Sequence, residues 1–371
     1  MIVGLFSELI APGGVQTAGR QTAAALVLAA GRRNMDCRFL SLNDPVGTHS
    51  LSVGGVEIVF EGFGGSRARF IGAAIRASRD GAQVAWALHP NLAPIVAAMK
   101  ILRPRLQTIV CAHGVEVWTC LPTMRQLALR RADAVVAPSR YTGGKLATEQ
   151  GISNSRIHRL PWALDPSFEA LAAAPRRDSI SLQLPARRVI LTVARWSASE
   201  RYKGLDELIE VMPRIRAAIP DAVLVAIGNG DDRSRLEQKA ATVAGEGAVT
   251  FLNSLQGADL VAWYARCDVF ALPSSGEGFG LVFLEAMALG KPVVGGDHGG
   301  IPDIVEDGVA GFLVRQENCD QLASVLIELL RDEKLRHEMG QRGRECLLRN
   351  FRFENFSARV EEILRQICSL F

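Results

Sequence analysis

The sequence lacks the short patterns that would mark several kinds of metal, redox and cofactor site. Its seven cysteines are scattered and never form Cys-x2-Cys, so we expect neither a disulfide framework nor structural zinc, and a reducing cytoplasmic setting. No Asp-x-Asp occurs, which disfavours a metal-dependent enzyme that uses this pattern. No Gly-x-Gly-x-x-Gly occurs either, which disfavours a dinucleotide-dependent dehydrogenase. No apolar run is long enough to span a membrane. Met1–Leu9 has no basic residue and contains Glu8, which indicates a first strand rather than a signal peptide.

The 371 residues are long enough for two domains, and their balance of 48% hydrophobic and 22% charged residues is that of a globular protein. Short apolar runs alternate with helical patterns throughout, which predicts two parallel α/β sheets whose ligands bind beyond the carboxyl ends of the strands. The expected strands are Ile2–Phe6, Cys37–Leu42, Val56–Phe60, Val84–Leu88, Thr108–Ala112, Ala134–Ala137, Arg156–Leu160, Val189–Val193, Ala222–Ile227, Val249–Leu252, Val269–Leu272 and Val293–Gly295.

The net charge of +3 conceals an asymmetry between the two halves of the chain. Residues 1–163 contain 18 Lys and Arg against 9 Asp and Glu, whereas the remainder contains 24 basic and 30 acidic residues. A basic first half suggests an anionic partner, such as a membrane surface, a diphosphate-bearing acceptor or nucleic acid. Nucleic acid is supported by charge alone, and we do not expect it as a partner.

The most informative stretch is Ser274–Pro292, where a buried strand leads through a glycine-rich turn into an apolar helix that begins near Gly280. This arrangement gathers free backbone N–H groups and the positive end of the helix dipole, which together bind phosphate. Glu277 and Glu285 bracket the turn, and carboxylates beside a phosphate site are favourable when hydroxyls donate to them. The combination points to a ligand with both phosphates and sugar hydroxyls, a nucleotide sugar.

These residues resemble the Glu-x7-Glu motif of retaining glycosyltransferases with the GT-B fold, and the flanking Gly-Phe-Gly and Gly-Lys-Pro-Val-Val strengthen the likeness. The resemblance implies two Rossmann-like parallel-sheet domains that face a cleft, with the last helix returning to the first domain. We expect an acceptor domain at residues 1–165, a linker at 166–187, a nucleotide-sugar domain at 188–351 and the returning helix at 352–371.

The resemblance also implies roles for individual residues. Arg195 and Lys203, around Glu-Arg-Tyr-Lys-Gly, resemble the cations that clamp the donor diphosphate, and we expect both at an open cleft. His113 matches the histidine that faces the transferred sugar, Glu277 would accept from sugar hydroxyls, and Glu285 from the ribose. The catalytic residues are thus His113, Arg195, Lys203 and Glu277, and the donor-binding residues are Gly13, Gly14, Gly228, Phe279, Gly280, Leu281 and Glu285.

At two further places, the sequence gives less specific indications of a residue's role. Ser139 is placed to cap the helix that follows it, with an acceptor contact as its second reading. At Trp162-Ala163-Leu164-Asp165, members of the family more often have Asn-Gly-Val-Asp, so only Asp165 is retained and its role stays open.

Similar enzymes keep the anomeric configuration of the donor, and no carboxylate stands out as the nucleophile of a double displacement. We therefore expect same-face substitution, with no metal and no cofactor beyond the donor itself. The Ser199-Glu200-Arg201-Tyr202-Lys203-Gly204 variant resembles bacterial mannosyltransferases acting on lipid-linked acceptors, so GDP-mannose is the expected donor. A UDP-sugar transferase, a UDP-sugar epimerase and a non-catalytic two-lobed sugar- or phosphate-binding protein remain alternatives.

The basic first half suggests that this domain docks on anionic lipid at the inner face of the membrane. The arginines that would do so are Arg67, Arg69, Arg76, Arg79, Arg103 and Arg105.

Overall fold

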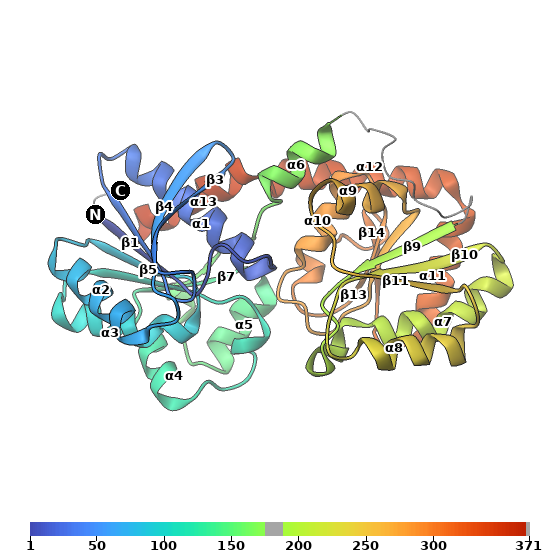
Figure 1. Cartoon of the computed structure of the whole chain (residues 1–371), viewed down its shortest axis with the longest axis horizontal. Helices are drawn as coiled ribbons and strands as arrows, with labels where there is room; N and C mark the ends of the chain where they lie inside the picture. The colour runs from blue at the N-terminus through green and yellow to red at the C-terminus, as the bar shows by residue number, and fades with distance from the viewer. Residues whose placement is uncertain (175–187, 369–371) are drawn as a thin grey trace. The chain divides into compact units, whose positions relative to one another are not determined.

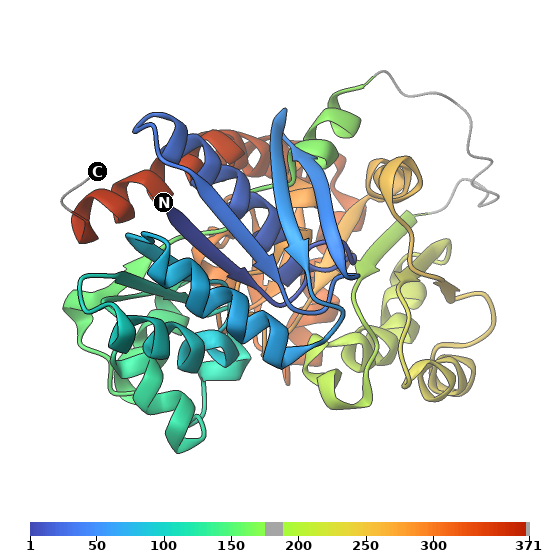
Figure 2. The ribbon, with the colours of Figure 1, turned by 60° about the vertical axis from the view of Figure 1, so that its left-hand side comes forward.

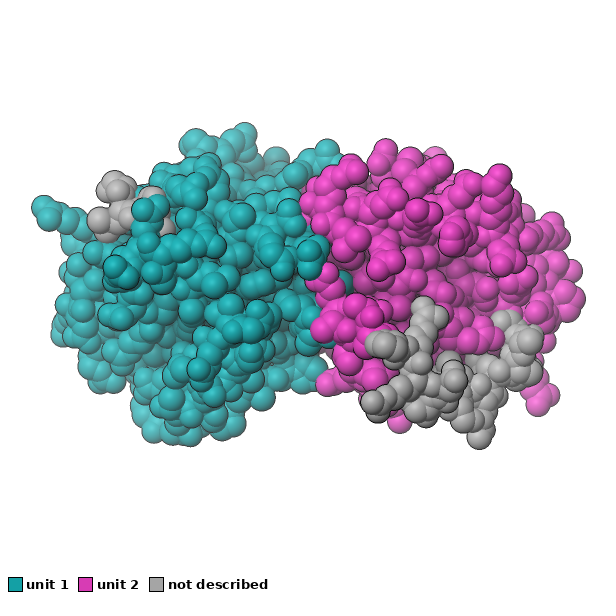
Figure 3. Space-filling view, turned by 90° about the horizontal axis from the view of Figure 1, so that it is seen from above, with its two compact units in different colours: residues 1–167, 351–371 teal, residues 168–350 magenta. Residues whose placement is uncertain are grey.

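The computed structural model describes residues 1–174 and 188–368. The described chain divides into two compact units, unit 1 formed by Met1–Ser167 and Phe351–Phe371 and unit 2 by Phe168–Asn350 (Figure 3). Each unit is a parallel α/β sheet covered by helices (Figure 1), which is the expected GT-B architecture. The final helix belongs to unit 1, as the resemblance implied.

Unit 1 contains an eight-stranded sheet in the order β3-β4-β2-β1-β5-β6-β7-β8, parallel except for β3. Its strands are β1 Ile2–Phe6, β2 Cys37–Ser41, β3 Gly47–Val53, β4 Val56–Gly62, β5 Val84–Ala87, β6 Gln107–Cys111, β7 Ala134–Ala137 and β8 Ile157–Arg159. Its helices are α1 Gly14–Gly31, α2 Arg67–Arg79, α3 Ala93–Leu102, α4 Thr123–Arg130, α5 Arg140–Thr148 and α13 Phe353–Ile367, with single turns at η1 Pro90–Leu92, η2 Val115–Val117 and η3 Asn154–Arg156.

The inner strands of unit 1 are buried on both faces, because helices cover both sides of the sheet. One apolar cluster joins the sheet to α2, α3 and α4, through residues such as Phe70, Met99 and Leu129. On α13 the side chains of Phe356, Val360, Ile363 and Leu364 are buried, and this helix packs along α1 (Figures 1 and 2). Glu361 of α13 also forms an ion pair with Arg32, directly after α1.

Unit 2 contains a six-stranded, fully parallel sheet in the order β11-β10-β9-β12-β13-β14. Its strands are β9 Arg188–Val193, β10 Ala222–Ile227, β11 Val249–Leu252, β12 Val269–Leu272, β13 Val293–Gly296 and β14 Gly311–Val314. Its helices are α6 Pro166–Ala173, most of which lies in this unit, α7 Leu205–Ala218, α8 Arg233–Lys239, α9 Gly257–Arg266, α10 Leu281–Ala288, α11 Cys319–Arg331 and α12 Glu333–Asn350. Shorter turns are η4 Ala198–Lys203, η5 Ala240–Ala244 and η6 Ile301–Asp303.

One face of α7 is apolar and buried, and it consists of Leu205, Leu208, Ile209, Met212 and Ile215. They pack with α8, α11 and α12 against the sheet in a second apolar cluster. Two strands, β3 and β14, were not anticipated from the sequence.

The segment expected to be a linker begins with a helix. Asp165 accepts hydrogen bonds from the backbone N–H (2.8 Å) and hydroxyl (2.6 Å) of Ser167, which stabilises the start of α6. The capping of α6 gives Asp165 the role that the sequence left open. The rest of the expected linker, residues 175–187, lies outside the described residues.

Candidate functional site

In unit 2 the order in which strands are added to the sheet reverses between β9 and β12. The strands β10 and β11 lie on one side of this central pair, and β13 and β14 lie on the other. At such a point the loops after the two central strands diverge, and open α/β sheets bind ligands in the space that results. Lys203 follows β9, and Glu277 follows β12. The topology therefore brings together residues that are 74 positions apart in the sequence.

Backbone hydrogen bonds fasten the loops after four of these strands to one another. Trp196 N–H donates to Asn229 O (2.9 Å), Ser275 N–H to Tyr202 O (2.9 Å) and Gly300 N–H to Glu277 O (2.7 Å). Backbones can approach this closely only where glycine leaves room. A Cβ on Gly300 would lie 2.2 Å from the carbonyl oxygen of Gly278. The loop ends are thus preorganised as one rigid set.

At the centre of these loops, Lys203 Nζ donates to Glu277 Oε2 at 2.6 Å. Both side chains are mostly buried, with 20% of Lys203 and 18% of Glu277 exposed. Burial alone would lower the pKa of Lys203, but the charge of Glu277 and its hydrogen bond outweigh burial and raise that pKa. Lys203 is therefore a protonated cation whose position is held by Glu277.

Arg195 lies in a different environment from Lys203. Its side chain is 71% exposed, and it forms an ion pair with Glu200 in the same loop. The hydrogen bonds that Arg195 donates to Glu200 raise the pKa of Arg195, so the guanidinium is charged. Because Arg195 is exposed, its side chain can turn toward an incoming anion with little change in packing.

Glu285, the second carboxylate of the motif, is oriented by a tyrosine that sequence reasoning missed. Tyr264 Oη donates to Glu285 Oε2 at 2.7 Å, and Tyr264 itself is fully buried. Burial, followed by the charge of Glu285, raises the pKa of Tyr264 well above its usual value, so the phenol keeps its proton and remains a donor.

The glycine-rich turn before α10 has the backbone that the sequence indicated. Gly280 adopts φ +101°, a conformation that side chains disfavour, and Leu281 starts the helix. No side chain caps this end and its first turn has no acidic residue, so backbone N–H groups remain available for an anion. Phe279 is buried and can contribute only through its backbone or its packing. On the neighbouring loop, Gly228 lies against the backbone of Ala194.

His113, in unit 1, is part of a stack of rings. Its imidazole lies parallel to His89 (centroids 5.7 Å apart) and to Trp162 (5.3 Å apart). His113 Nε2 lies 2.6 Å from the carbonyl oxygen of Leu88, which can only accept, so Nε2 carries a proton. Burial lowers the pKa of His113, which favours the neutral ring with Nδ1 as an acceptor.

The loop between β1 and α1, which contains Gly13, is held from both sides. Asp44 accepts from the backbone N–H groups of Leu9 (2.7 Å) and Ile10 (3.1 Å). Arg20 of α1 donates to the carbonyl oxygens of Leu9 (2.8 Å) and Ala11 (3.1 Å). Gly13 has φ +145°, and Gly14 is the first residue of α1. Neither Asp44 nor Arg20 stands out in the sequence, since most of their hydrogen bonds are to backbone atoms of the loop.

The expectation for Ser139 has a structural outcome. Ser139 caps α5, because its hydroxyl accepts from the backbone N–H of Thr142 at 3.3 Å. In residues 1–174 and 188–368, no group of three or more His, Cys, Asp or Glu side chains is arranged to hold a metal ion. Over the same residues, no helix combines the length and apolar character needed to cross a bilayer.

Comparison with known proteins identifies relatives of this arrangement. The family model described as glycosyl transferases group 1 matches residues 179–346. A GDP-mannose-dependent alpha-(1-6)-phosphatidylinositol monomannoside mannosyltransferase of Mycolicibacterium smegmatis is 34% identical over 268 residues, which cover 69% of this chain and 69% of the relative. The protein of the same name from Mycobacterium tuberculosis (strain ATCC 25618 / H37Rv) is 31% identical over 287 residues, with 72% and 74% covered.

Solved structures agree on the fold. Anabaena Alr3699/HepE in complex with UDP superposes with a TM-score of 0.79 at 19% identity, covering 98% of this chain and 99% of that chain. WaaG, a glycosyltransferase involved in lipopolysaccharide biosynthesis, gives a TM-score of 0.71 at 17% identity, also over 98% and 99%. The chain belongs to the group 1 glycosyl transferases and is a retaining hexosyltransferase with the GT-B fold.

Proposed function

We propose that this enzyme transfers mannose from GDP-mannose to a lipid-linked acceptor in the synthesis of a cell-surface glycan. The observation that carries the proposal is the 34% identity over 268 residues to an enzyme whose name specifies GDP-mannose and a phosphatidylinositol mannoside. The segment Ser199-Glu200-Arg201-Tyr202-Lys203-Gly204 supports the same donor.

In this proposal Arg195 and Lys203 neutralise the donor diphosphate, and the backbone N–H groups of Gly280 and Leu281 at the start of α10 bind its oxygens. Glu285, held by Tyr264, accepts from the ribose hydroxyls. The roles of Gly13, Gly14 and His113 toward the donor remain predictions, because they concern unit 1.

The Lys203–Glu277 pair bears on how the anomeric configuration is retained. A carboxylate nucleophile must be free to attack the anomeric carbon, whereas Glu277 is engaged by an ammonium group at 2.6 Å. We therefore assign Glu277 to the sugar hydroxyls and to holding Lys203. The reaction then proceeds on one face of the sugar: the diphosphate departs, and one of its oxygens takes the proton of the incoming acceptor hydroxyl. No metal is required in this scheme, because cations of the protein stabilise the leaving group.

The decisive experiment screens GDP, UDP and ADP and their sugars for stabilisation of the fold, followed by transfer assays with radiolabelled GDP-mannose and membrane lipid extracts. Selective stabilisation by GDP and a mannosylated lipid product are expected. Selective stabilisation by UDP would instead indicate a UDP-sugar donor, and stabilisation by GDP without a mannosylated lipid would refute the proposed acceptor. We also propose that the enzyme works at the inner face of the membrane, where a lipid acceptor and a soluble donor are both accessible.

A further inference from the structure

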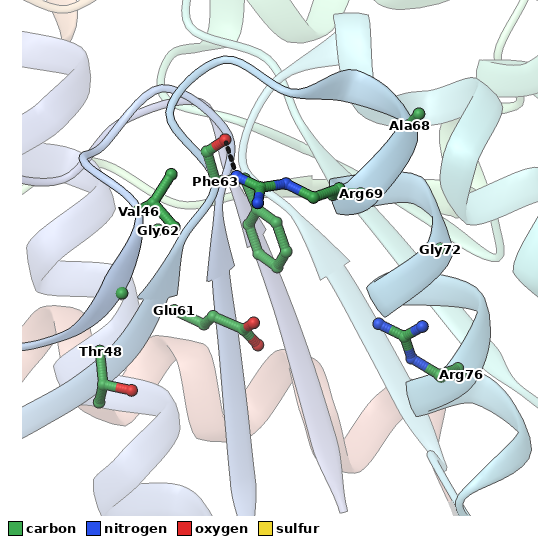
Figure 4. Close-up of a pocket in the computed structure, with 10 residues that line it drawn as sticks. Val46, Thr48, Glu61, Gly62, Phe63, Ala68, Arg69, Gly72 and Arg76 are labelled. Carbon is green, nitrogen blue, oxygen red and sulfur yellow. Dashed lines mark hydrogen bonds between the residues drawn. The ribbon is translucent and has the colours of Figure 1, made fainter.

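The arginines of α2 are not equivalent, because only two of them line a pocket. This pocket, which we call the α2 pocket, has a volume of about 550 Å³ and lies between α2 and the β3–β4 hairpin of unit 1 (Figure 4). Its lining residues are Val46, Gly47, Thr48, Glu61, Gly62, Phe63, Ala68, Arg69, Gly72 and Arg76. Arg67 and Arg79 belong to the same helix but do not line the pocket.

Helical spacing explains this division. Residues 69, 72 and 76 recur at intervals of three and four, so they share one face of α2. Gly72 leaves that face open between the two arginines, since no side chain fills the space. Figure 4 shows both guanidinium groups extending from α2 toward β4.

The charges in the α2 pocket are unevenly compensated. Its one acidic side chain, Glu61, forms an ion pair with Arg38 of β2 at 3.8 Å. Arg69 makes only a long hydrogen bond, 3.5 Å, to the carbonyl oxygen of Phe63. Across the described ranges, no carboxylate lies within ion-pair distance of Arg69 or Arg76. Two cations in one concave site therefore remain without a counter-charge.

Other groups in the pocket suit a ligand with hydroxyls. Thr48 offers a hydroxyl, and the carboxylate of Glu61 can accept from hydroxyl donors. At the rim, the side chain of Val46 is 61% exposed and provides apolar contact. The first turn of α2 contains no acidic residue and Ser66 makes no capping hydrogen bond, so this helix end adds partial positive charge beside Arg69.

The geometry points to the α2 pocket as a binding site for a phosphate group esterified to a polyol, held by Arg69 and Arg76. Paired guanidinium groups match the oxygens of a phosphate, and the pocket volume falls in the usual range for small ligands, roughly 300–1,000 Å³. The head group of a phospholipid has this chemistry. The further step, that this head group belongs to the acceptor, rests on the proposed function.

A specific phosphate site and general electrostatic docking on an anionic surface depend on different arginines, so an experiment can distinguish them. If the net positive charge of the domain alone attracted it to anionic lipid, Arg67 and Arg79 would contribute as much as Arg69 and Arg76, since all four are exposed. A specific binding site in the α2 pocket would depend on Arg69 and Arg76 alone. The variants Arg69→Gln/Arg76→Gln and Arg67→Gln/Arg79→Gln remove the same charge from the same helix and form a matched comparison.

The probe is glycerophosphoglycerol, a soluble phosphodiester flanked by polyols, titrated into the full-length protein and followed by NMR of the arginine side chains. Saturable binding to the wild type is expected, weakened roughly tenfold or more in Arg69→Gln/Arg76→Gln and less than twofold in Arg67→Gln/Arg79→Gln. Glycerol and inorganic phosphate serve as controls and should bind more weakly. Absence of saturable binding, equal loss in both double variants, or equal affinity for inorganic phosphate would overturn the assignment.

A second arm tests the lipid as the source of the phosphate. Vesicles of phosphatidylcholine with and without phosphatidylglycerol are sedimented with each variant at rising salt. Binding to anionic vesicles should persist at higher salt in the wild type and in Arg67→Gln/Arg79→Gln than in the pocket variant, whereas identical salt curves would refute a lipid ligand. Stabilisation by GDP is measured in parallel and should be unchanged in both variants, so failure of this site and failure of the proposed donor can be distinguished.

Discussion

The Lys203–Glu277 ion pair should contribute both to the stability of unit 2 and to catalysis, and a double-mutant cycle separates the two. Replacing Lys203 by Met removes the cation and leaves Glu277 mostly buried, with 18% of its side chain exposed. Losing one partner of a fully buried pair costs about 3–5 kcal/mol, and a charge-assisted hydrogen bond is worth about 1.5–3 kcal/mol. Because about a fifth of each side chain reaches solvent, we expect a loss of about 2–3 kcal/mol, which lowers the Tm by about 5–10 °C.

The double variant Lys203→Met/Glu277→Gln should be more stable than Lys203→Met alone, because the buried charge is removed together with its partner. A coupling free energy of about 1–2 kcal/mol is expected from urea or thermal denaturation. Turnover behaves differently, since the double variant still lacks the cation for the diphosphate and should stay roughly 10²–10³-fold below the wild type. Additive stability effects, or recovery of turnover in the double variant, would refute the reasoning.

Three further outcomes are expected. Arg195→Ala should lower turnover by roughly 10²–10³-fold with an unchanged Tm, because its side chain is 71% exposed; normal kinetics would remove Arg195 from the site. Transfer should continue in excess EDTA and give a product with the anomeric configuration of the donor, as NMR of the product can verify. Burial is the main cause that lowers the pKa of His89 to about 4, and the adjacent His113 ring adds to it, so the folded state resists protonation of His89. Its contribution to stability is therefore complete above pH 6.5 and is lost as the pH falls toward 4, and His89→Gln should lose roughly 1–2 kcal/mol less than the wild type between pH 7 and 5 in urea denaturation.

The strands that could be predicted are those with continuous apolar runs, such as Ala222–Ile227, because a strand buried on both faces needs no polar alternation. The edge strand β3 was missed because Thr48, His49, Ser50 and Ser52 give it little apolar character. Its signal was the pair Gly54-Gly55, which joins Val53 to Val56 as a two-residue hairpin turn with positive φ at both glycines.

Site residues could be predicted only where a local pattern reports them. The turn before α10 consists of consecutive residues, so its conformation could be predicted from the local pattern of glycines. The pairing of Lys203 with Glu277 depends on β9 and β12 being neighbours, and the sequence does not state strand order. The Tyr264–Glu285 hydrogen bond could not be predicted for a similar reason, since its two residues belong to different helices, α9 and α10.

The structure explains why this chain can have Trp162 where similar enzymes more often have Asn. The backbone of Ala163 is bonded to the buried side chain of Gln21, which fixes where this segment passes the sheet. Trp162 then fills the space between His113 and Phe356 of α13, with ring centroids 5.3 and 5.8 Å away. A small residue at this position would leave His113 without one of its two stacking partners, and α13 without a contact to the loop after β6. In this enzyme the returning helix is therefore part of the support for His113, so a change at Phe356 would be transmitted to that imidazole through a single intervening ring.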